Sequence, residues 1–244
     1  MSFKNYFNKN SFECKLPGTG ETISISPLTT GQMKKVLIYQ DEKNPIKLEE
    51  VIDEVISSSV LSDNFNIDNI YVNDRYFLLI ELRKISKGNK YTFQYTCPNC
   101  KSQAMSSIDI SELEVKERKE PENNTIEVTD EVYVTVNHIT RKDEKEAYSI
   151  IDMNSDPHII EGEVSVNTLA AGIKSVTTPD GTEDNLLFED KKFIIENSTI
   201  SSLEKLRDWY EENWFGINFT FSITCPHCKY ETPKQTIPFT SDFF

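Results

Sequence analysis

Two short cysteine motifs constrain this chain more than any other feature. Residues 97–100 read Cys-Pro-Asn-Cys and residues 225–228 read Cys-Pro-His-Cys; each follows a stretch that alternates polar and apolar residues and precedes a lysine. Two thiolates on one tight turn supply half of a tetrahedral zinc site, and a second such turn supplies the other half. The paired motifs therefore predict one structural Zn²⁺ ion. Its predicted ligands are Cys97, Cys100, Cys225 and Cys228.

Redox catalysis is one alternative to metal binding, because Cys-Pro-His-Cys also occurs in the active sites of thioredoxin-fold oxidoreductases. In those enzymes the first cysteine lies at the N-terminus of a helix, whose dipole lowers the pKa of the thiol. Here Pro233 and Pro238 stand where that helix would continue, and the residues after the motif favour a returning strand. The sequence therefore disfavours a redox enzyme.

Structural disulfides are a second alternative. A ring closed within a single Cys-x-x-Cys is too small to stabilise a fold much, and disulfides are rare in reducing compartments. The N-terminus lacks the apolar core of a signal peptide, so we expect the chain to fold in a reducing cytoplasm. A site closed by four thiolates also leaves no coordination position for water. We therefore expect the zinc to be structural and not catalytic.

The charge of the chain limits its partners. Its 40 acidic and 26 basic residues give a net charge of −14, whereas a nucleic-acid-binding protein needs a cationic surface that displaces counterions from phosphates. Zinc ribbons often bind DNA or RNA, but this composition predicts protein partners and no nucleic acid. No apolar run approaches about 18 residues, so no membrane span is expected.

Hydrophobic periodicity and turn residues predict an α+β chain. Residues 112–124 are predicted to form a linker, and residues 177–190 a polar insertion that turns at Pro179-Asp180-Gly181. Ser201 and Glu204 are predicted to form the capping box of the last helix. Helices are expected at residues 27–39, 47–60, 73–87, 141–153, 164–176 and 201–215, and strands at residues 22–26, 91–96, 126–136 and 218–224.

The elements around the two cysteine motifs recur at a constant offset. Both cysteines of the second motif follow their counterparts in the first at the same offset, and Gly216 follows Gly88 at that offset too. This regularity predicts internally duplicated helical units, with an N-terminal repeat of residues 1–120 and a C-terminal repeat of residues 121–244. Each repeat would carry one zinc-binding β-hairpin, and one zinc-ribbon-like site would join the repeats into a single structural unit. Two unrelated zinc-binding turns remain the alternative, because the similarity outside the motifs is modest.

Little in the sequence suggests catalysis. His138, His158 and His227 are too scattered to predict a triad or a catalytic metal site, and His227 is expected to face solvent in its turn. No glycine-rich phosphate loop occurs among the eight glycines. Cys14 lies outside both motifs, and no role is predicted for it. The chain is therefore expected not to be an enzyme.

Both ends of the chain are aromatic. Ends of a chain are ordered only when something holds them, and aromatic residues are enriched in binding hot spots. The two predictions are that these ends cover the protein's own core, or that at least one docks onto a neighbouring subunit. The residues concerned are Phe3, Tyr6, Phe7, Phe12, Phe239, Phe243 and Phe244.

One stretch resembles a known family. Residues 74–88 read Asp-Arg-Tyr-Phe-Leu-Leu-Ile-Glu-Leu-Arg-Lys-Ile-Ser-Lys-Gly, and with residues 16–28 they resemble the baseplate hub proteins of T-even-like contractile-tailed bacteriophages. In that family a similar helix ends in Leu-Arg-x-x-Ser-x-Gly and leads to a cysteine-bearing hairpin. The resemblance covers residues 15–120 closely and the second half in outline. Family members differ in how many of these cysteines they keep, so the zinc prediction depends on this sequence alone.

The resemblance implies a non-enzymatic component or assembly factor of the tail baseplate hub. It also implies other baseplate proteins as partners, and a location in the host cytoplasm during assembly or in the virion. The alternative is a zinc-ribbon regulator of transcription or replication that binds nucleic acid or a polymerase. The charge of the chain distinguishes the two, because only the alternative requires a cationic surface.

Overall fold

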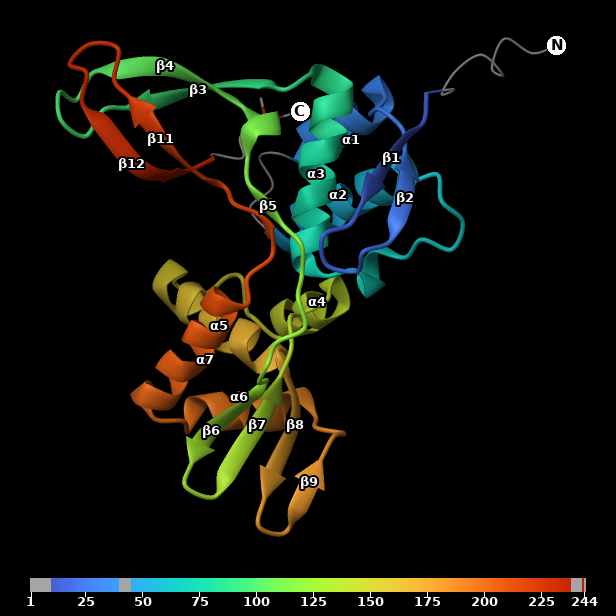
Figure 1. The fold of residues 1–244 in the computed structure, drawn as a ribbon, viewed down its shortest axis with the longest axis vertical. Coiled ribbons are helices and arrows are strands. Elements are labelled where there is room, and N and C mark those ends of the chain that lie inside the picture. The colour runs from blue at the N-terminus through green and yellow to red at the C-terminus, as the bar shows by residue number, and fades with distance from the viewer. Residues whose placement is uncertain (1–9, 40–44, 238–242, 244) are drawn as a thin grey trace. The chain divides into compact units, whose positions relative to one another are not determined.

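The structure is a computed structural model that describes residues 10–39, 45–237 and 243. Contacts between residues divide the chain into two units, and each unit contains more than one segment of the chain (Figure 1). Unit 1 consists of Met1–Phe65, Tyr76–Lys116 and Gly216–Phe244, and unit 2 of Asn66–Arg75 and Glu117–Phe215. The chain thus enters unit 2 first at Asn66 and again at Glu117, within the predicted linker. It returns to unit 1 at Gly216, so both cysteine motifs lie in unit 1.

The predicted α+β class is confirmed in unit 1, where small antiparallel sheets accompany the helices. Arg83 fixes the end of α3 by donating from Nη1 to the Gly88 carbonyl at 2.6 Å and from Nη2 to the Lys90 carbonyl at 3.0 Å. Gly88 adopts the left-handed conformation that ends helices (φ +89°). The helices are α1 (Thr30–Tyr39), α2 (Pro45–Ser59) and α3 (Val72–Lys87), which begins in unit 2, with the short 3₁₀ helix η3 (Ile110–Glu112).

The strands of unit 1 form four two-stranded antiparallel pairs among the described residues. Leu78 and Leu82 of α3 are fully buried, as their helical spacing predicts, and Ile85 is half-buried. The strand pairs are β1 (Phe12–Lys15) with β2 (Thr22–Ile25), β3 (Lys90–Thr96) with β4 (Gln103–Asp109), β5 (Val115–Lys116) with β10 (Gly216–Ile217), and β11 (Thr220–Thr224) with β12 (Glu231–Thr236).

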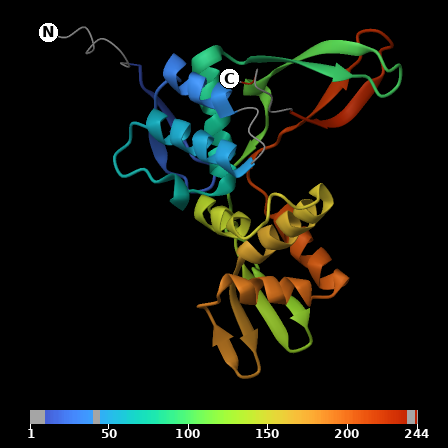
Figure 2. The same ribbon diagram turned by 180° about the vertical axis from the view of Figure 1, so that it is seen from behind.

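Unit 2 is a four-stranded antiparallel sheet packed against helices. Views from opposite sides show α6 running across one face of this sheet (Figures 1 and 2). Val128, Val134 and Val136 are buried, as the alternation of residues 126–136 predicts. The strand order is β6 (Thr125–Thr129), β7 (Val132–Val136), β8 (Ile173–Thr178) and β9 (Gly181–Glu183); the helices are η2 (Ile67–Asn69), α4 (Arg141–Ser149), α5 (Pro157–Ala171), α6 (Phe188–Glu196) and α7 (Ile200–Glu212).

Several boundaries differ from the sequence prediction. The helix expected at residues 164–176 lies at Pro157–Ala171, because Asp156 caps it and Pro157 occupies its first turn. The last predicted residues of that helix belong to β8 instead. Helix α7 is capped by Thr199, whose hydroxyl accepts from the Ser202 amide at 3.1 Å, so the predicted Ser201–Glu204 capping box is wrong. Strand β1 and helix α6 were not predicted.

Part of the aromatic ends can be located. Phe3, Tyr6, Phe7, Phe239 and Phe244 lie outside the described residues. Phe12 belongs to β1, where its side chain is 43% exposed. Phe243 is buried, and its ring lies edge-on to that of Tyr91 with 5.2 Å between ring centres. For this one residue, the prediction that an end covers the protein's own core holds.

Local features around the two cysteine motifs repeat in register. Helices α3 and α7 begin at Val72 and Ile200, and β4 and β12 begin at Gln103 and Glu231, so both pairs of elements are separated by the same offset as the cysteines. Gly88 and Gly216, again at this offset, have φ of +89° and +93°. Duplication of residues 1–120 and 121–244 as whole repeats stays a prediction.

The charge of the chain is divided unevenly between the units. Unit 1 contains 15 basic and 15 acidic residues, whereas unit 2 contains 11 basic and 25 acidic residues. Unit 2 therefore holds the whole net charge of −14. Across the part of the chain that the structure describes, no helix combines the length and apolar character that a membrane span requires.

Gly172 separates α5 from β8 at a crowded position. The Tyr210 hydroxyl donates to the Asn137 carbonyl at 3.1 Å, and the Asn137 amide donates to the Gly172 carbonyl at 3.0 Å. A Cβ atom at Gly172 would overlap Tyr210 Oη, whereas a Cβ at Gly162, within α5, would meet nothing within 4 Å. The first glycine is required by packing, and the second is not.

We predict opposite effects for alanine at these two glycines. Gly172→Ala should lower the free energy of unfolding by about 1–3 kcal/mol, because it overpacks the space occupied by Tyr210. Gly162→Ala should raise it by about 0.5–1 kcal/mol, because alanine is the better helix former. Urea unfolding followed by tryptophan fluorescence measures this in unit 2, which contains both tryptophans of the chain, Trp209 and Trp214. Equal effects of the two substitutions would contradict the packing role of Gly172.

Candidate metal centre

Two β-hairpins of unit 1 carry the predicted zinc ligands. The first cysteine turn connects β3 to β4, and the second connects β11 to β12. Phe93 of β3 and Phe221 of β11 occupy equivalent positions before the two turns, and their rings contact each other edge-to-face with 5.6 Å between ring centres. An aromatic contact of this kind between equivalent residues brings the two hairpins together.

The two cysteine turns have the same backbone geometry. In the first, the Lys101 amide donates to the Cys97 carbonyl at 3.0 Å; in the second, the Lys229 amide donates to the Cys225 carbonyl at 3.0 Å. Lys101 and Lys229 both adopt left-handed conformations, with φ of 59° and 60°. Each turn closes tightly enough that its two cysteine side chains point to the same side.

The structure brings all four predicted ligands together. Their sulfur atoms lie within 4.8 Å of one another. The sulfurs of Cys97 and Cys228 are 3.7 Å apart, and those of Cys100 and Cys225 are 3.8 Å apart. Four sulfurs at about 2.3 Å from a tetrahedral zinc ion would be about 3.8 Å apart. The separations fit a four-thiolate metal site and are far too long for disulfides.

Backbone amides of each turn point at the first cysteine of that turn. The amides of Cys228 and His227 donate to Cys225 Sγ and lower the pKa of its thiol to about 6. The amides of Cys100 and Asn99 likewise favour the Cys97 thiolate. Burial and the neighbouring thiols outweigh them, however, and raise the pKa of Cys97 to about 11. The pKa values of Cys97, Cys100 and Cys225 thus depend on neighbouring thiols, as expected of sulfurs gathered at one point.

Burial separates the ligands into two pairs. Cys97 and Cys225, the first cysteine of each turn, are fully buried, whereas Cys100 and Cys228 are exposed. Hydrogen bonds from Ser102 lower the pKa of the Cys100 thiol. The cluster of four sulfurs is therefore buried on the side of Cys97 and Cys225 and accessible to solvent on the side of Cys100 and Cys228. The accessible side gives a metal ion a path of entry.

Two neighbours of the sulfur cluster could not be identified from the motifs. Asn99 Nδ2 donates to Cys228 Sγ at 3.6 Å, from the opposite turn. The Tyr95 hydroxyl lies beside Cys225, and desolvation together with that thiol raises the pKa of Tyr95 to about 12. Asn99 lies within a cysteine motif, and this position is only a weak indication that it contacts a sulfur. Nothing in the sequence pairs Tyr95 with a cysteine of the other, distant motif.

The remaining cysteine and histidines lie apart from this cluster. Cys14 is partly buried, and desolvation and Glu81 raise the pKa of its thiol to about 12, so it is a poor nucleophile and metal ligand. His227 is exposed in the second cysteine turn, as predicted, and His158 is exposed at the start of α5. Among the described residues, only the four motif cysteines form a group close enough to hold a metal ion.

His138 is buried in unit 2 among aromatic rings. Its ring lies 4.8 Å from that of Phe215, 5.1 Å from that of Trp209 and 5.8 Å from that of Tyr210. Burial, and secondarily the Arg118 guanidinium, lower the pKa of His138 from 6.5 to about 4. The ring is therefore neutral at pH 7, and it packs as an aromatic side chain.

This environment predicts a pH dependence of stability. Below pH 6.5 the unfolded chain binds a proton at His138 that the folded chain does not bind until about pH 4. The free energy of unfolding is therefore unaffected by His138 above pH 6.5 and decreases as the pH falls toward 4, by about 3 kcal/mol at most. His138→Phe should lose less stability than the wild type between about pH 7.5 and 5. Tryptophan-monitored urea unfolding measures both proteins, and parallel losses would contradict the assignment to His138.

Comparison with known proteins identifies the family of the chain. A family model described as T4 bacteriophage base plate protein matches residues 9–244. No curated protein and no solved structure matches. The match covers both halves of the chain, including both cysteine turns, and so extends the resemblance seen in residues 15–120. The chain therefore belongs to the T4 bacteriophage base plate protein family.

Proposed function

We propose that this chain is a structural, non-enzymatic component or assembly factor of a phage baseplate hub, and that a structural zinc ion stabilises its unit 1. Family membership supports a structural role in a baseplate. The observation that carries the metal is the approach of four sulfurs to within 4.8 Å of one another from two distant turns. The proposed ligands are Cys97, Cys100, Cys225 and Cys228.

The chemistry of the four sulfurs favours zinc. Thiolates are soft ligands, and a tetrahedral arrangement of four of them is typical of zinc or of iron–sulfur clusters. Sulfur–sulfur distances of 3.7 and 3.8 Å match a single central ion. A closed four-thiolate site has no position for substrate or activated water, so the ion would contribute stability and no catalysis.

The architecture explains why such an ion would be needed. A two-stranded hairpin is marginally stable in water by itself. The hairpins β3–β4 and β11–β12 are two-stranded, and the second lies near the C-terminal end of the sequence. A metal ion that binds two thiolates from each would cross-link them. It would thereby hold the second hairpin against the first.

The partners we propose are other baseplate proteins, met in the host cytoplasm during assembly or in the finished virion. An acidic unit 2 and a unit 1 with no net charge offer no cationic excess for nucleic acid. A structural component should appear in mass spectra of purified virions. An assembly factor should be absent there and co-purify with hub proteins from infected cells. Finding it in neither preparation would refute the proposed function.

We predict one zinc ion per chain in the purified protein. Cys225→Ser should lose the ion and lower the melting temperature of unit 1 sharply, because structural zinc contributes on the order of 10 kcal/mol to the folding of small domains. Elemental analysis gives the stoichiometry, and calorimetry gives the melting temperature. Cys14→Ser is the matched control, because it removes a thiol from the same unit and should retain the ion. A metal-free wild type would refute the site.

The location of the ligands predicts that the first half of the chain cannot hold the ion alone. A fragment of residues 1–120 contains Cys97 and Cys100 but neither cysteine of the second turn, and it lacks the Phe221 ring against Phe93. It should bind zinc at least about a hundredfold more weakly than the full chain, since two thiolates fill half of a tetrahedral site. Competition with a chromogenic chelator measures this affinity. Tight binding by the monomeric fragment would contradict a shared site.

A further inference from the structure

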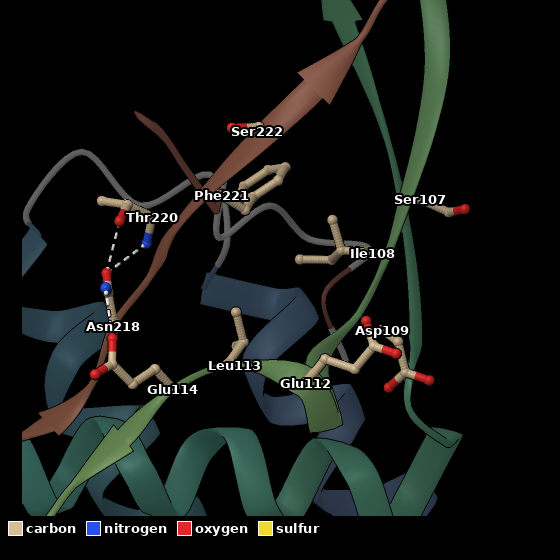
Figure 3. Close-up of a pocket in the computed structure, with 10 residues that line it drawn as sticks. All are labelled: Ser107, Ile108, Asp109, Glu112, Leu113, Glu114, Asn218, Thr220, Phe221 and Ser222. Atoms are coloured by element: carbon tan, nitrogen blue, oxygen red, sulfur yellow. Dashed lines mark hydrogen bonds between the residues drawn. The ribbon is translucent and has the colours of Figure 1, made fainter. Parts of the chain in front are cut away.

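The first hairpin (β3–β4) and the second hairpin (β11–β12) of unit 1 are loosely packed away from their cysteine turns. A pocket of about 450 Å³ lies there between residues of β4 and β11, and Ile108 and Phe221 extend into it with Leu113 below them (Figure 3). Side chains separated by such a space are not in van der Waals contact across it. Interactions near the four sulfurs therefore matter more for holding the second hairpin against the first.

Two side chains of the first hairpin reach the sulfurs of the second. Asn99 Nδ2 donates to Cys228 Sγ at 3.6 Å. The Tyr95 hydroxyl is buried beside Cys225 and has no hydrogen-bond partner of ordinary geometry among the described residues. A buried hydroxyl without a partner destabilises a fold, so this one favours a good acceptor at Cys225.

These contacts between the hairpins are not symmetric. Ile223 and His227 occupy the positions of the second hairpin that correspond to Tyr95 and Asn99 of the first. The side chain of Ile223 has no hydrogen-bond donor, and His227 is exposed. Both side-chain contacts described above therefore run from the first hairpin to a sulfur of the second.

The chemistry of a four-thiolate site gives such donors a role. Each sulfur must be ionised to bind a divalent ion, so four thiolates leave the site with excess negative charge. Hydrogen bonds to an ionised acceptor are stronger than those to a neutral one. The amides of His227 and Cys228 already donate to Cys225, but they belong to the same turn as that sulfur. A donor from the opposite hairpin stabilises the thiolate and the contact between the hairpins together.

We propose that Tyr95 and Asn99 are positioning residues of the metal centre, which donate to the thiolates of Cys225 and Cys228 and so fix the second hairpin on the ion. This inference deepens the proposed function and rests on it, because the donors act on metal-bound sulfurs. Hydrogen-bond partners of this kind orient metal ligands and tune how strongly they bind. The cysteine motifs define the ligands, whereas these two residues would set the affinity of the second turn.

The zinc affinity of the full-length protein, measured by competition with a chromogenic chelator, tests both donors. Tyr95→Phe keeps the ring and removes the hydroxyl, and it should weaken zinc binding about tenfold or more. Asn99→Ala removes a donor that is exposed to water, so its effect should be smaller, about threefold or more.

Each variant has a matched control in the second hairpin. Tyr230→Phe removes a hydroxyl from a tyrosine that is 44% exposed and follows the second cysteine turn. His227→Ala truncates the exposed side chain at the position equivalent to Asn99. Both controls should bind zinc as tightly as the wild type.

Cobalt(II) in place of zinc distinguishes a donor to sulfur from a residue that merely supports the hairpins. Its visible d–d bands report tetrahedral binding by four sulfurs, and its near-ultraviolet bands report charge transfer from sulfur to the metal. A hydrogen bond lowers the energy of a sulfur lone pair, so Tyr95→Phe and Asn99→Ala should move the charge-transfer bands to longer wavelength. The d–d bands should stay unchanged, which also shows that the variants still fold around the ion.

Unchanged affinity and unchanged charge-transfer bands in both variants would overturn the proposal, and so would equal losses of affinity in variants and controls. Altered d–d bands in both variants would also overturn it, because they would assign these residues to the fold of the hairpins. A wild type that binds neither ion would refute the metal centre itself and these donors with it. Normal cobalt bands in the wild type and in both variants would refute this inference alone.

Discussion

The meeting of two β-hairpins from distant parts of the chain is the constraint on which unit 1 depends. Phe93 packs on Phe221, and beyond that contact the four sulfurs converge in crossed pairs, Cys97 with Cys228 and Cys100 with Cys225. The pairs join one turn to the other, so neither turn forms the cluster alone. A metal ion placed there would act on the long loop between the turns, where a cross-link removes the most chain entropy.

Unit 2 is connected to unit 1 through a pair of adjacent strands. The chain leaves unit 1 after β5 and returns with β10, and these two strands pair through Lys116 with Gly216. Residues 117–215 are thus a long excursion whose two ends emerge from adjacent strands. Such an arrangement lets unit 2 carry its own core and its own charge. In this protein it carries all of the net negative charge, while the unit with the cysteines has none. For a baseplate protein, this places two surfaces of different character on one chain.

Local sequence signals predicted most of the helices and several of the strands, because the causes of these elements are local. The periodic apolar residues of α3 and the alternation of β6 and β7 require only neighbours in the sequence to be recognised. The signals failed where distant contacts decided the outcome. The helix predicted at residues 164–176 would run through Gly172, but the Tyr210 hydroxyl, which comes from α7, occupies the space beside that residue. Strand β1 was not predicted, because so short a strand is stabilised mainly by its partner β2.

The residues of the candidate metal centre could be identified from the sequence alone. The Cys-x-x-Cys spacing places two thiols on one turn through local backbone geometry, and a tetrahedral ion requires two such turns. The fold was needed to show which sulfurs face each other, that Asn99 and Tyr95 lie beside them, and that His138 is neutral among aromatic rings. The fold also showed that the net charge belongs to one unit and that residues of β4 and β11 line a pocket. These properties depend on which distant segments exclude water from each other, and burial of that kind is a sum over the whole fold that no local pattern encodes.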